Sequence, residues 1–230
     1  EVDCFIVPEE LAYFPSLLQN TGLFDIAELT PEDKKRADMM MAETKRKGAA
    51  TQMSEEEFKK SLELKIDIFE AEEQHFGRIT QLTNKTNQFN VTTIRRTQDE
   101  IEAFSTDPDT LVMGMDIKDR FGEYGLVGVA IIQKENPEFW NIDSLMMSCR
   151  VLGRGAETSF LNKISEAVQT KGGKILKGRY VETKKNGLVR TLFPDHNFTA
   201  TANADEWFCN VEDIKSAPEE VEITLRLSNE

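Results

Sequence analysis

Residues 139 to 171 decide the fold: Phe139-Trp-Asn-Ile-Asp-Ser-Leu-Met-Met-Ser-Cys-Arg-Val-Leu-Gly-Arg-Gly-Ala-Glu157, followed by apolar residues at helical spacing. The apolar run from Ile142 to Met147 has the length of a strand. Two glycines interrupt the pattern, and the later helical pattern stops at Lys171-Gly-Gly, a cation followed by glycines. The sequence therefore predicts a strand, a glycine-containing turn and then a helix.

The turn between this strand and helix suits an anion. The first backbone N–H groups of a helix lack an internal partner, and the helix dipole places partial positive charge there. Gly153 and Gly155 have no Cβ, so a phosphate oxygen can approach the backbone closely. Arg150 and Arg154 add charge and forked donors. An ordinary glycine turn is the competing interpretation, because short glycine motifs often occur by chance.

The spacing Arg-x-x-Gly-x-Gly resembles the pyrophosphate-binding turn of GNAT acyltransferases. This resemblance implies that the turn binds the pyrophosphate of coenzyme A, or the phosphopantetheine of a carrier. It also implies that Asn186, close to the start of a later expected helix, contacts the pantetheine arm. The residues of the turn are Arg150, Val151, Leu152, Gly153, Arg154 and Gly155.

A closer resemblance covers nearly the whole chain and is most specific between residues 80 and 194. The segments 87–93, 119–129, 142–155 and 185–194 are similar to the C-terminal half of FkbH-like proteins. Those proteins resemble a HAD-type phosphatase followed by a GNAT-like domain. The resemblance implies transfer of a glyceryl group from a phosphorylated three-carbon acid to the thiol of an acyl carrier protein, toward methoxymalonyl-type polyketide extender units. It also implies that this chain lacks phosphatase chemistry.

The charge, hydropathy and cysteine content of the chain limit which partners and which cellular setting we expect. The chain has 230 residues, 39% hydrophobic and 30% charged, as in ordinary globular proteins, and its formal net charge of -13 argues against nucleic acid. No apolar stretch reaches membrane-spanning length. Cys4, Cys149 and Cys209 are far apart, which predicts no disulfide framework, no metal site and a reducing, cytoplasmic setting. The first residues lack signal-peptide features, so we expect a segment of a longer protein, and the resemblance to FkbH-like proteins implies a HAD-like domain before it.

The remaining pattern predicts an α/β (α+β) fold: a mixed, mostly antiparallel GNAT-like sheet flanked by helices, preceded by a helical N-terminal segment. Residues 1–64 are expected to be a helical tail or linker with a short strand at 4–7, and residues 65–230 the GNAT-like domain. Expected strands are 65–69, 111–117, 125–133, 142–147, 174–181, 207–211 and 221–227, the last two antiparallel. Expected helices are 31–47, 55–62, 72–84, 98–107, 156–171 and 183–193, with capping boxes before the second and fourth.

Cys149 is the predicted catalytic nucleophile. It lies directly before Arg150 and close to the expected helix N-terminus, and both features favour a thiolate. In this interpretation Cys149 holds the acyl group as a thioester before passing it to the carrier thiol. The alternative is a small, buried, apolar cysteine. His75 and His196 are the only histidines. Such residues usually lie on the surface, and His196 is kept as a candidate base.

A dense polar loop is the expected recognition site for the acyl group or a phosphate, although polar loops are usually just solvated. Its candidate residues are Asn87, Gln88, Asn90, Thr92 and Arg95. Lower candidates are Asp119, Arg120 and Asp143. An acidic carrier protein has to dock on a local basic patch. The candidates for that patch are Arg95, Arg96, Lys184, Lys185 and Arg190.

Two other functions stay open at this point. The first is a non-catalytic GNAT-like module that docks an acyl carrier protein and supports a phosphatase half, since a fold alone does not establish chemistry. The second is an N-acetyltransferase that acts on an amine with acetyl-coenzyme A. It requires a carboxylate or histidine base beside the thioester, and the sequence does not place one.

Overall fold

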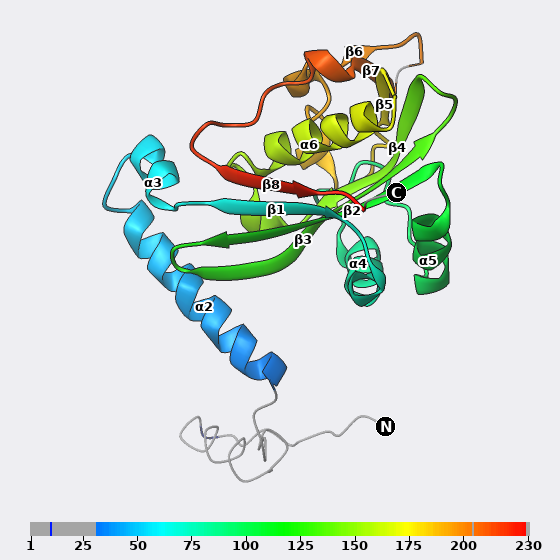
Figure 1. Cartoon of the computed structure of the whole chain (residues 1–230). Coiled ribbons are helices and arrows are strands. Elements are labelled where there is room, and N and C mark those ends of the chain that lie inside the picture. Colours follow the sequence, from blue (N-terminus) through cyan, green and yellow to red (C-terminus); the bar gives the residue numbers. More distant parts are fainter. Residues whose placement is uncertain (1–9, 11–30, 204, 229–230) are drawn as a thin grey trace. The chain divides into compact units, whose positions relative to one another are not determined.

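The computed structural model describes residue 10, residues 31–203 and residues 205–228 (Figure 1). The expected strand at 4–7, the expected cap at Thr30 and Cys4 lie outside these residues. The chain divides into two units, Glu1–Met41 and Ala42–Glu230. Helix α2 (Pro31–Ala50) confirms the expected helix of residues 31–47. The expected domain boundary after residue 64 stays a prediction.

One eight-stranded sheet organises the second unit, in the order β6-β7-β5-β4-β3-β2-β1-β8. Strand β1 pairs β8 in parallel and β4 pairs β5 in parallel, whereas the other neighbours are antiparallel. This is the mixed, mostly antiparallel sheet that the sequence predicts. The strands are β1 (Lys65–Glu70), β2 (Thr110–Asp119), β3 (Gly122–Lys134), β4 (Phe139–Met147), β5 (Ile175–Arg179), β6 (Thr199–Ala200), β7 (Glu206–Asn210) and β8 (Glu222–Arg226).

Helices cover both faces of the sheet (Figure 1). Helices α4 (Glu73–Lys85) and α5 (Gln98–Thr106) lie on one face, and α6 (Ala156–Thr170) lies on the other. The short α3 (Glu55–Ser61) precedes β1. Both expected capping boxes are confirmed, at Ser54 and at Thr97, because these reciprocal hydrogen bonds depend only on residues three apart.

Two hydrophobic clusters form the core on opposite faces of the sheet. Ile68 belongs to the cluster that contains Phe160 of α6, whereas its neighbour Phe69 belongs to the cluster that contains Phe76 and Ile79 of α4. Successive side chains of a strand point to opposite faces, so adjacent residues of β1 serve different clusters. The sheet is therefore buried on both sides along most of its centre.

Two expectations about the C-terminal third are wrong. The expected helix of residues 183–193 is replaced by two 3-10 turns, η3 (Gly187–Val189) and η4 (Pro194–His196). The Asn186 side chain accepts the backbone N–H of Thr183, which commits this segment to a turn. The last two strands do not pair with each other, because β7 pairs β5 and β8 lies parallel to β1 at the opposite edge.

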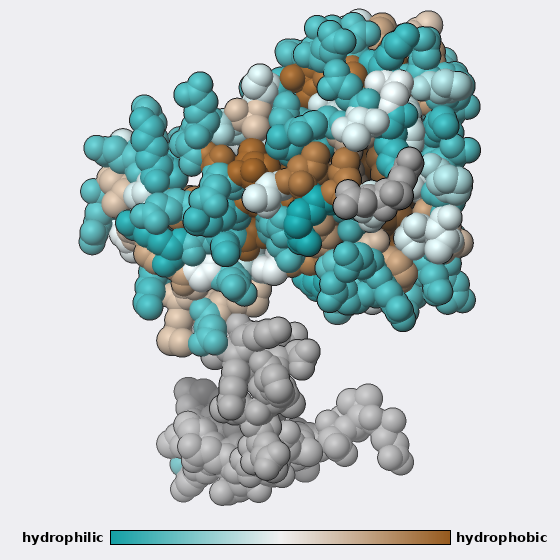
Figure 2. Space-filling view, viewed as in Figure 1, coloured by the Kyte–Doolittle hydropathy of each residue, from teal (hydrophilic) through white to brown (hydrophobic). Residues whose placement is uncertain are grey.

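The edge strand β8 leaves part of its apolar surface exposed. Figure 2 shows hydrophobic side chains gathered in a band across the middle of this face, in the region of β8 and α6, with polar side chains around it. Ile223 and Leu225 are partly buried against the core, and they alternate with exposed neighbours. No helix of the described residues is long and apolar enough to cross a membrane.

Candidate functional site

The predicted turn forms where the sequence places it. Strand β4 ends at Met147, a 3-10 turn (η2, Cys149–Val151) follows, and α6 starts at Ala156. Gly153 and Gly155 have φ values of 73° and 80°. L-residues with a side chain rarely adopt this left-handed conformation, so the turn requires glycine at both positions.

A carboxylate of the chain itself already binds the backbone of this turn, however. The carboxylate of Glu157, in the first turn of α6, accepts the N–H of Gly153 at 3.0 Å. The other carboxylate oxygen of Glu157 is buried without a hydrogen-bond partner among the described residues. A Cβ on Gly155 would lie 2.7 Å from Pro218 Cγ, whereas a Cβ on Gly153 would meet open space. An incoming anion therefore reaches the turn at Gly153 and has to displace Glu157 from its N–H.

Arg154 points away from the turn. Its guanidinium donates to the Tyr124 hydroxyl and lies 4.0 Å from Asp119. Arg46 of α2 pairs with the same carboxylate, through contacts of 2.7 and 2.8 Å, and lies over the Tyr124 ring. Burial lowers the pKa of Arg154. Arg154 and Asp119 thus belong to a buried ionic cluster that joins α2 to the β2–β3 turn, which leaves Arg150 as the exposed arginine of the motif.

Strands β4 and β5 pair over a short distance and then diverge. Their parallel register runs from Phe139 beside Ile175 to Ile142 beside Gly178. Further along β4, residues 89–91 replace β5 as the neighbour: Val91 N donates to Leu145 O at 3.1 Å, and Met147 N donates to Phe89 O at 3.0 Å. On their other side, Val181 N donates to Val91 O at 2.8 Å. The chain's own loop therefore fills the gap between the two strands.

Two buried asparagines hold this loop, and we call them the amide clasp. Asn186 donates to Asn90 O and to Val181 O, both at 2.9 Å, and its oxygen accepts the N–H and hydroxyl of Thr183. Asn90 donates to Thr86 O and accepts the N–H of Thr93. Both asparagines are 0% exposed. The structure thus gives them a structural task, and their contact with a ligand stays a prediction.

The other residues of the predicted recognition loop have similar partners. The hydroxyl of Thr92 donates to Asp143 O at 2.9 Å. Arg95 donates to Thr83 O and to the side chain of Asn87, and Gln88 is exposed. Most polar groups of the loop therefore bind other parts of the chain. Their role in acyl recognition stays a prediction.

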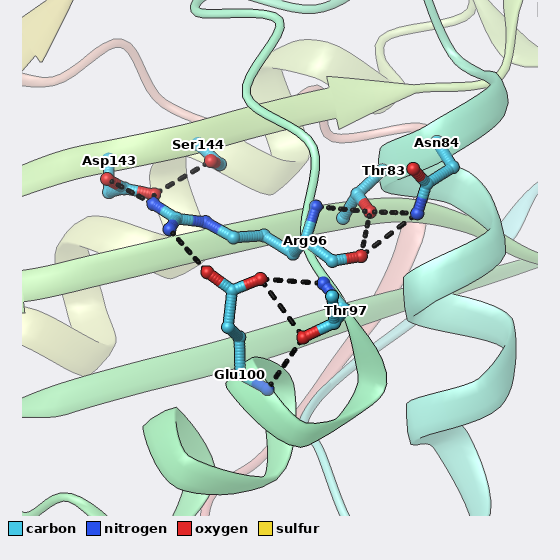
Figure 3. A network of polar contacts seen from close by, with 7 residues as sticks. All are labelled: Thr83, Asn84, Arg96, Thr97, Glu100, Asp143 and Ser144. Atoms are coloured by element: carbon cyan, nitrogen blue, oxygen red, sulfur yellow. Dashed lines mark hydrogen bonds and ion pairs between the residues drawn. The ribbon is translucent and has the colours of Figure 1, made fainter.

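Arg96 is the centre of a polar network between α4, α5 and β4 (Figure 3). Its guanidinium contacts both oxygens of Asp143, at 2.9 and 2.8 Å, and Glu100 at 3.3 Å. Thr83 and Asn84 of α4 bind its backbone. With its side chain 16% exposed, Arg96 fastens α5 to the sheet, and its role in docking a partner stays a prediction.

The two described cysteines differ in environment. Cys149 is exposed at the end of β4. Cys209 is buried in β7, and burial, with Asp213 nearby, raises the pKa of its thiol to about 11. Among the described contacts, no base is hydrogen-bonded to Cys149. Its predicted nucleophilic role stays a prediction.

A cavity of about 330 Å³, which we call the α6 cavity, opens beside the first turn of α6. Its wall combines that turn with the tip of the inserted loop and with the segment that contains η3 and η4. It is lined by Phe89, Glu157, Thr158, Leu188, Thr191, Leu192, Asp195, His196 and Lys215. Three larger hollows, of about 690, 560 and 710 Å³, have no residue of 149–158 in their linings. The α6 cavity is therefore the candidate site.

One wall of the α6 cavity contains a directed chain of hydrogen bonds. Nδ1 of His196 lies 2.6 Å from the Leu192 carbonyl oxygen, and Nε2 lies 2.9 Å from the Thr158 hydroxyl. A carbonyl oxygen can only accept, so Nδ1 carries the ring proton and, in the neutral ring, Nε2 accepts the proton of Thr158. Thr158 is 9% exposed and His196 4% exposed. His196 is therefore buried beside the cavity instead of lying on the surface.

Sequence reasoning missed Thr158 and Glu157 as site residues. Threonine and glutamate are common in the first turn of a helix, so neither residue is unusual there. Their position beside His196 follows from the packing of η4 against α6. The signal present in the sequence was His196, whose hydrogen-bond partner could not be read from it. His75 instead accepts the N–H of Glu72 at the start of α4. The described residues contain no group of three or more His, Cys, Asp or Glu side chains that could hold a metal ion.

Neither a protein-family model nor a curated protein sequence matches the chain. Solved structures resemble it in fold. The ribosomal-protein-S18-alanine N-acetyltransferase from Escherichia coli is 10% identical, over 67% of this chain and 97% of that chain, with a TM-score of 0.46. The GNAT domain of S. lividans PAT is 10% identical, over 62% and 89%, with a TM-score of 0.48. The spermidine N-acetyltransferase from Vibrio cholerae, solved with CoA and spermine, is 11% identical, over 64% and 96%, with a TM-score of 0.47. The function proposed below therefore rests on the chain's own residues.

Proposed function

We propose that this chain is an acyltransferase domain that moves a small hydroxylated acyl group, of the glyceryl type, onto a phosphopantetheine thiol of an acyl carrier protein. The observation that carries the proposal is the α6 cavity, where a buried Thr158–His196 pair lies beside the Arg-x-x-Gly-x-Gly turn. The phosphorylated three-carbon donor and a preceding HAD-like domain belong to the same proposal.

The cavity offers two kinds of stabilisation to an acyl group. The N-terminus of α6 puts partial positive charge beside the cavity, and that charge would stabilise a thioester oxygen that becomes negative during attack. The lining includes Thr191, Asp195 and Lys215, which suit the hydroxyl groups of a small polar acid. Phe89 and Leu188 supply the apolar part of the wall.

A carrier protein suits the turn better than free coenzyme A. Glu157 already occupies the N–H of Gly153, and Arg154 is turned toward Tyr124. A pyrophosphate brings more negative charge beside Glu157 than the single phosphodiester of a carrier-bound phosphopantetheine. Arg150 and the open side of Gly153 are the groups that would contact either phosphate.

The test is mass spectrometry of the protein with a glyceryl thioester of N-acetylcysteamine and three acceptors in parallel. The acceptors are phosphopantetheinylated carrier protein, coenzyme A and a polyamine. We expect glyceryl-carrier protein as the main product. Transfer to the amine alone would replace the proposal with an N-acyltransferase, and no transfer to any acceptor would contradict an enzymatic function.

One observation favours a second function, a carrier-docking module without chemistry. The loop of residues 89–91 fills the gap between β4 and residue 181, as in a site closed by its own chain. Exposed Lys184 and Lys185 remain for an acidic partner, and Arg190 is paired with Glu182. This function predicts that carrier protein binds, that affinity falls as salt is raised, and that no acyl group moves. Binding that salt does not change would point to an apolar contact instead.

A further inference from the structure

The strongest feature outside the sequence motifs is the pair formed by Thr158 and His196. The two residues lie 38 positions apart, on α6 and on η4, and both line the α6 cavity. The Leu192 carbonyl fixes the tautomer of the ring, so the unprotonated nitrogen faces the hydroxyl. This is the order of groups in which a base activates a hydroxyl and a third group orients the base.

We propose that Thr158 and His196 form a proton relay for acyl transfer, in which Thr158 contacts the reacting thiol and His196 is the positioning base behind it. The proposal rests on the function proposed above. It adds the residues that move the proton, which neither Cys149 nor the glycine turn supplies.

For a thioester donor, the kind used in the test, the relay conserves atoms and charge through the transfer. The acceptor sulfur attacks the thioester carbon and forms the new C–S bond, and its S–H proton passes to Thr158 Oγ1 while the hydroxyl proton passes to His196 Nε2. The carbonyl electron pair moves to oxygen. On collapse the old C–S bond breaks, Nε2 returns its proton to Oγ1, and the other Oγ1 proton passes to the leaving thiolate. One thioester and one thiol enter, and one of each leave.

The charges around His196 suit a base that is neutral at rest. Burial lowers the pKa of His196, and Lys215 lowers it further. The hydrogen bond to Leu192, Glu157 of α6 and Asp195 of η4 act in the opposite direction and stabilise the imidazolium when it forms. Glu157 has a buried oxygen without a hydrogen-bond partner among the described residues, so that part of its charge is not committed to another donor.

The competing explanation is that the pair only ties η4 to α6. A structural bond and a relay differ in what restores function. Serine keeps the hydroxyl of Thr158, and valine keeps its shape without the hydroxyl. Glutamine at position 196 can accept a hydrogen bond but cannot take a proton at neutral pH. These three substitutions therefore separate packing from proton transfer.

The experiment measures kcat and KM for glyceryl transfer from N-acetylcysteamine thioester to carrier protein, from pH 5.5 to 8.5. We expect Thr158→Val and His196→Gln to lower kcat by at least about a hundredfold with KM little changed, because a positioned general base contributes on the order of 10² to 10⁴. Thr158→Ser should stay within about tenfold of the wild type. Thr170→Val on the exposed end of α6 is the matched control, and its kcat should not change.

The wild-type kcat should fall at the acidic end of the pH profile as His196 is protonated, and the pH profile of His196→Gln should not show that fall.

A second readout does not depend on activity. Nitrogen-15 NMR of the ring should show Nδ1 protonated and Nε2 unprotonated in the wild type near pH 7.5. If the wild type transfers acyl groups and folded Thr158→Val does so at the same rate and pH profile, the relay is wrong and the proposed function stands. If the wild type transfers to no acceptor, both the proposed function and the relay are wrong. The hydrogen bond between Thr158 and His196 is then only structural. If Thr158→Val does not fold, a wild-type profile without the acidic limb overturns the relay.

Discussion

The amide clasp and the α6 cavity are two buried polar regions that meet at Phe89, and they use their hydrogen-bonding groups differently. In the clasp, Asn90 and Asn186 are fully buried, and both of their amide ends have backbone partners. In the cavity, one carboxylate oxygen of Glu157 has no hydrogen-bond partner among the residues that the structure describes, and the Thr158 hydroxyl donates to His196 beside the open space. A satisfied buried network fixes a fold, whereas an unsatisfied group beside a cavity marks a place where a ligand completes the hydrogen bonds.

The largest expected effect is the loss of the clasp. We predict that Asn186→Ala lowers the free energy of unfolding by about 3 to 5 kcal/mol, because it leaves several buried backbone groups without partners, each at a cost of about 1–3 kcal/mol. The partners lost are Thr183 N, Val181 O and Asn90 O. Urea unfolding followed by circular dichroism measures the change.

Asn210→Ala is the matched control for that prediction. Asn210 is exposed and its side chain donates to Asp213 on the surface, so its loss should change stability by no more than about 0.5 kcal/mol. Equal effects of the two substitutions would contradict a special role of the clasp. A stable Asn186→Ala protein that loses only ligand binding would restore the recognition role that the sequence suggested.

Local features of the fold were predictable from the sequence. The strand, turn and helix around Gly153 and the capping boxes at Ser54 and Thr97 depend on residues within a few positions of each other. The place of β8 was not predictable in this way. Its pairing with β1 joins residues such as Ile66 and Ile223, and such distant partners are chosen by packing against the whole core instead of by a local pattern.

The site shows the same division. The sequence located Asn90 and Asn186 as candidate polar residues, but it could not show that Asn186 donates to the backbone of Asn90, whereas Asn90 binds Thr86 and Thr93 of its own loop. It predicted that Arg154 contacts the anion, but it could not show that Tyr124 of β3 and Asp119 of β2 lie beside the guanidinium. The sequence did not identify Thr158 and Glu157 as site residues. The opposite wall of the cavity comes from a segment that was expected to be a helix, so their neighbours could not be predicted.

The second prediction compares the two described cysteines, one exposed (Cys149) and one buried (Cys209). We expect iodoacetamide to alkylate Cys149 about a hundredfold faster than Cys209 at pH 7.5, because Cys149 is exposed whereas Cys209 is buried with its thiol pKa raised to about 11. Peptide mapping of the folded protein over time gives both rates. Comparable rates would show that β7 opens readily, and the denatured protein, in which both thiols are exposed, is the control.

The third prediction sharpens the description of the turn. We expect Glu157→Gln to raise the affinity for coenzyme A by about three- to tenfold, equal to 0.7–1.4 kcal/mol, because it removes a negative charge from the N–H of Gly153. Gly153→Val should lower the affinity, because its side chain blocks approach to the backbone and because valine is strained at a φ of 73°. Gly155→Val is not an equivalent test, since its side chain would collide with Pro218. Calorimetry that shows no change in either variant would place the phosphate elsewhere.

The smallest expected effect is on the pH dependence of stability, and it concerns His196. Burial lowers the pKa of His196 in the folded chain below the value of about 6.5 that a histidine has when unfolded. Between these two values the unfolded chain binds a proton that the folded chain does not, so acid favours unfolding. The stabilising contribution is therefore complete above about pH 7.5 and is lost as the pH falls through 6.5 toward the folded pKa, with a slope of at most about 1.4 kcal/mol per pH unit.

We expect wild-type stability in urea to decrease from pH 7.5 to pH 5.5 more steeply than that of His196→Gln, in which this group is absent. Comparing the two proteins cancels the titration of carboxylates that both share. Parallel stability curves would mean that the cavity lets water reach the ring, so that His196 ionises equally in the folded and unfolded chains and the cavity wall is more open than its buried side chains indicate.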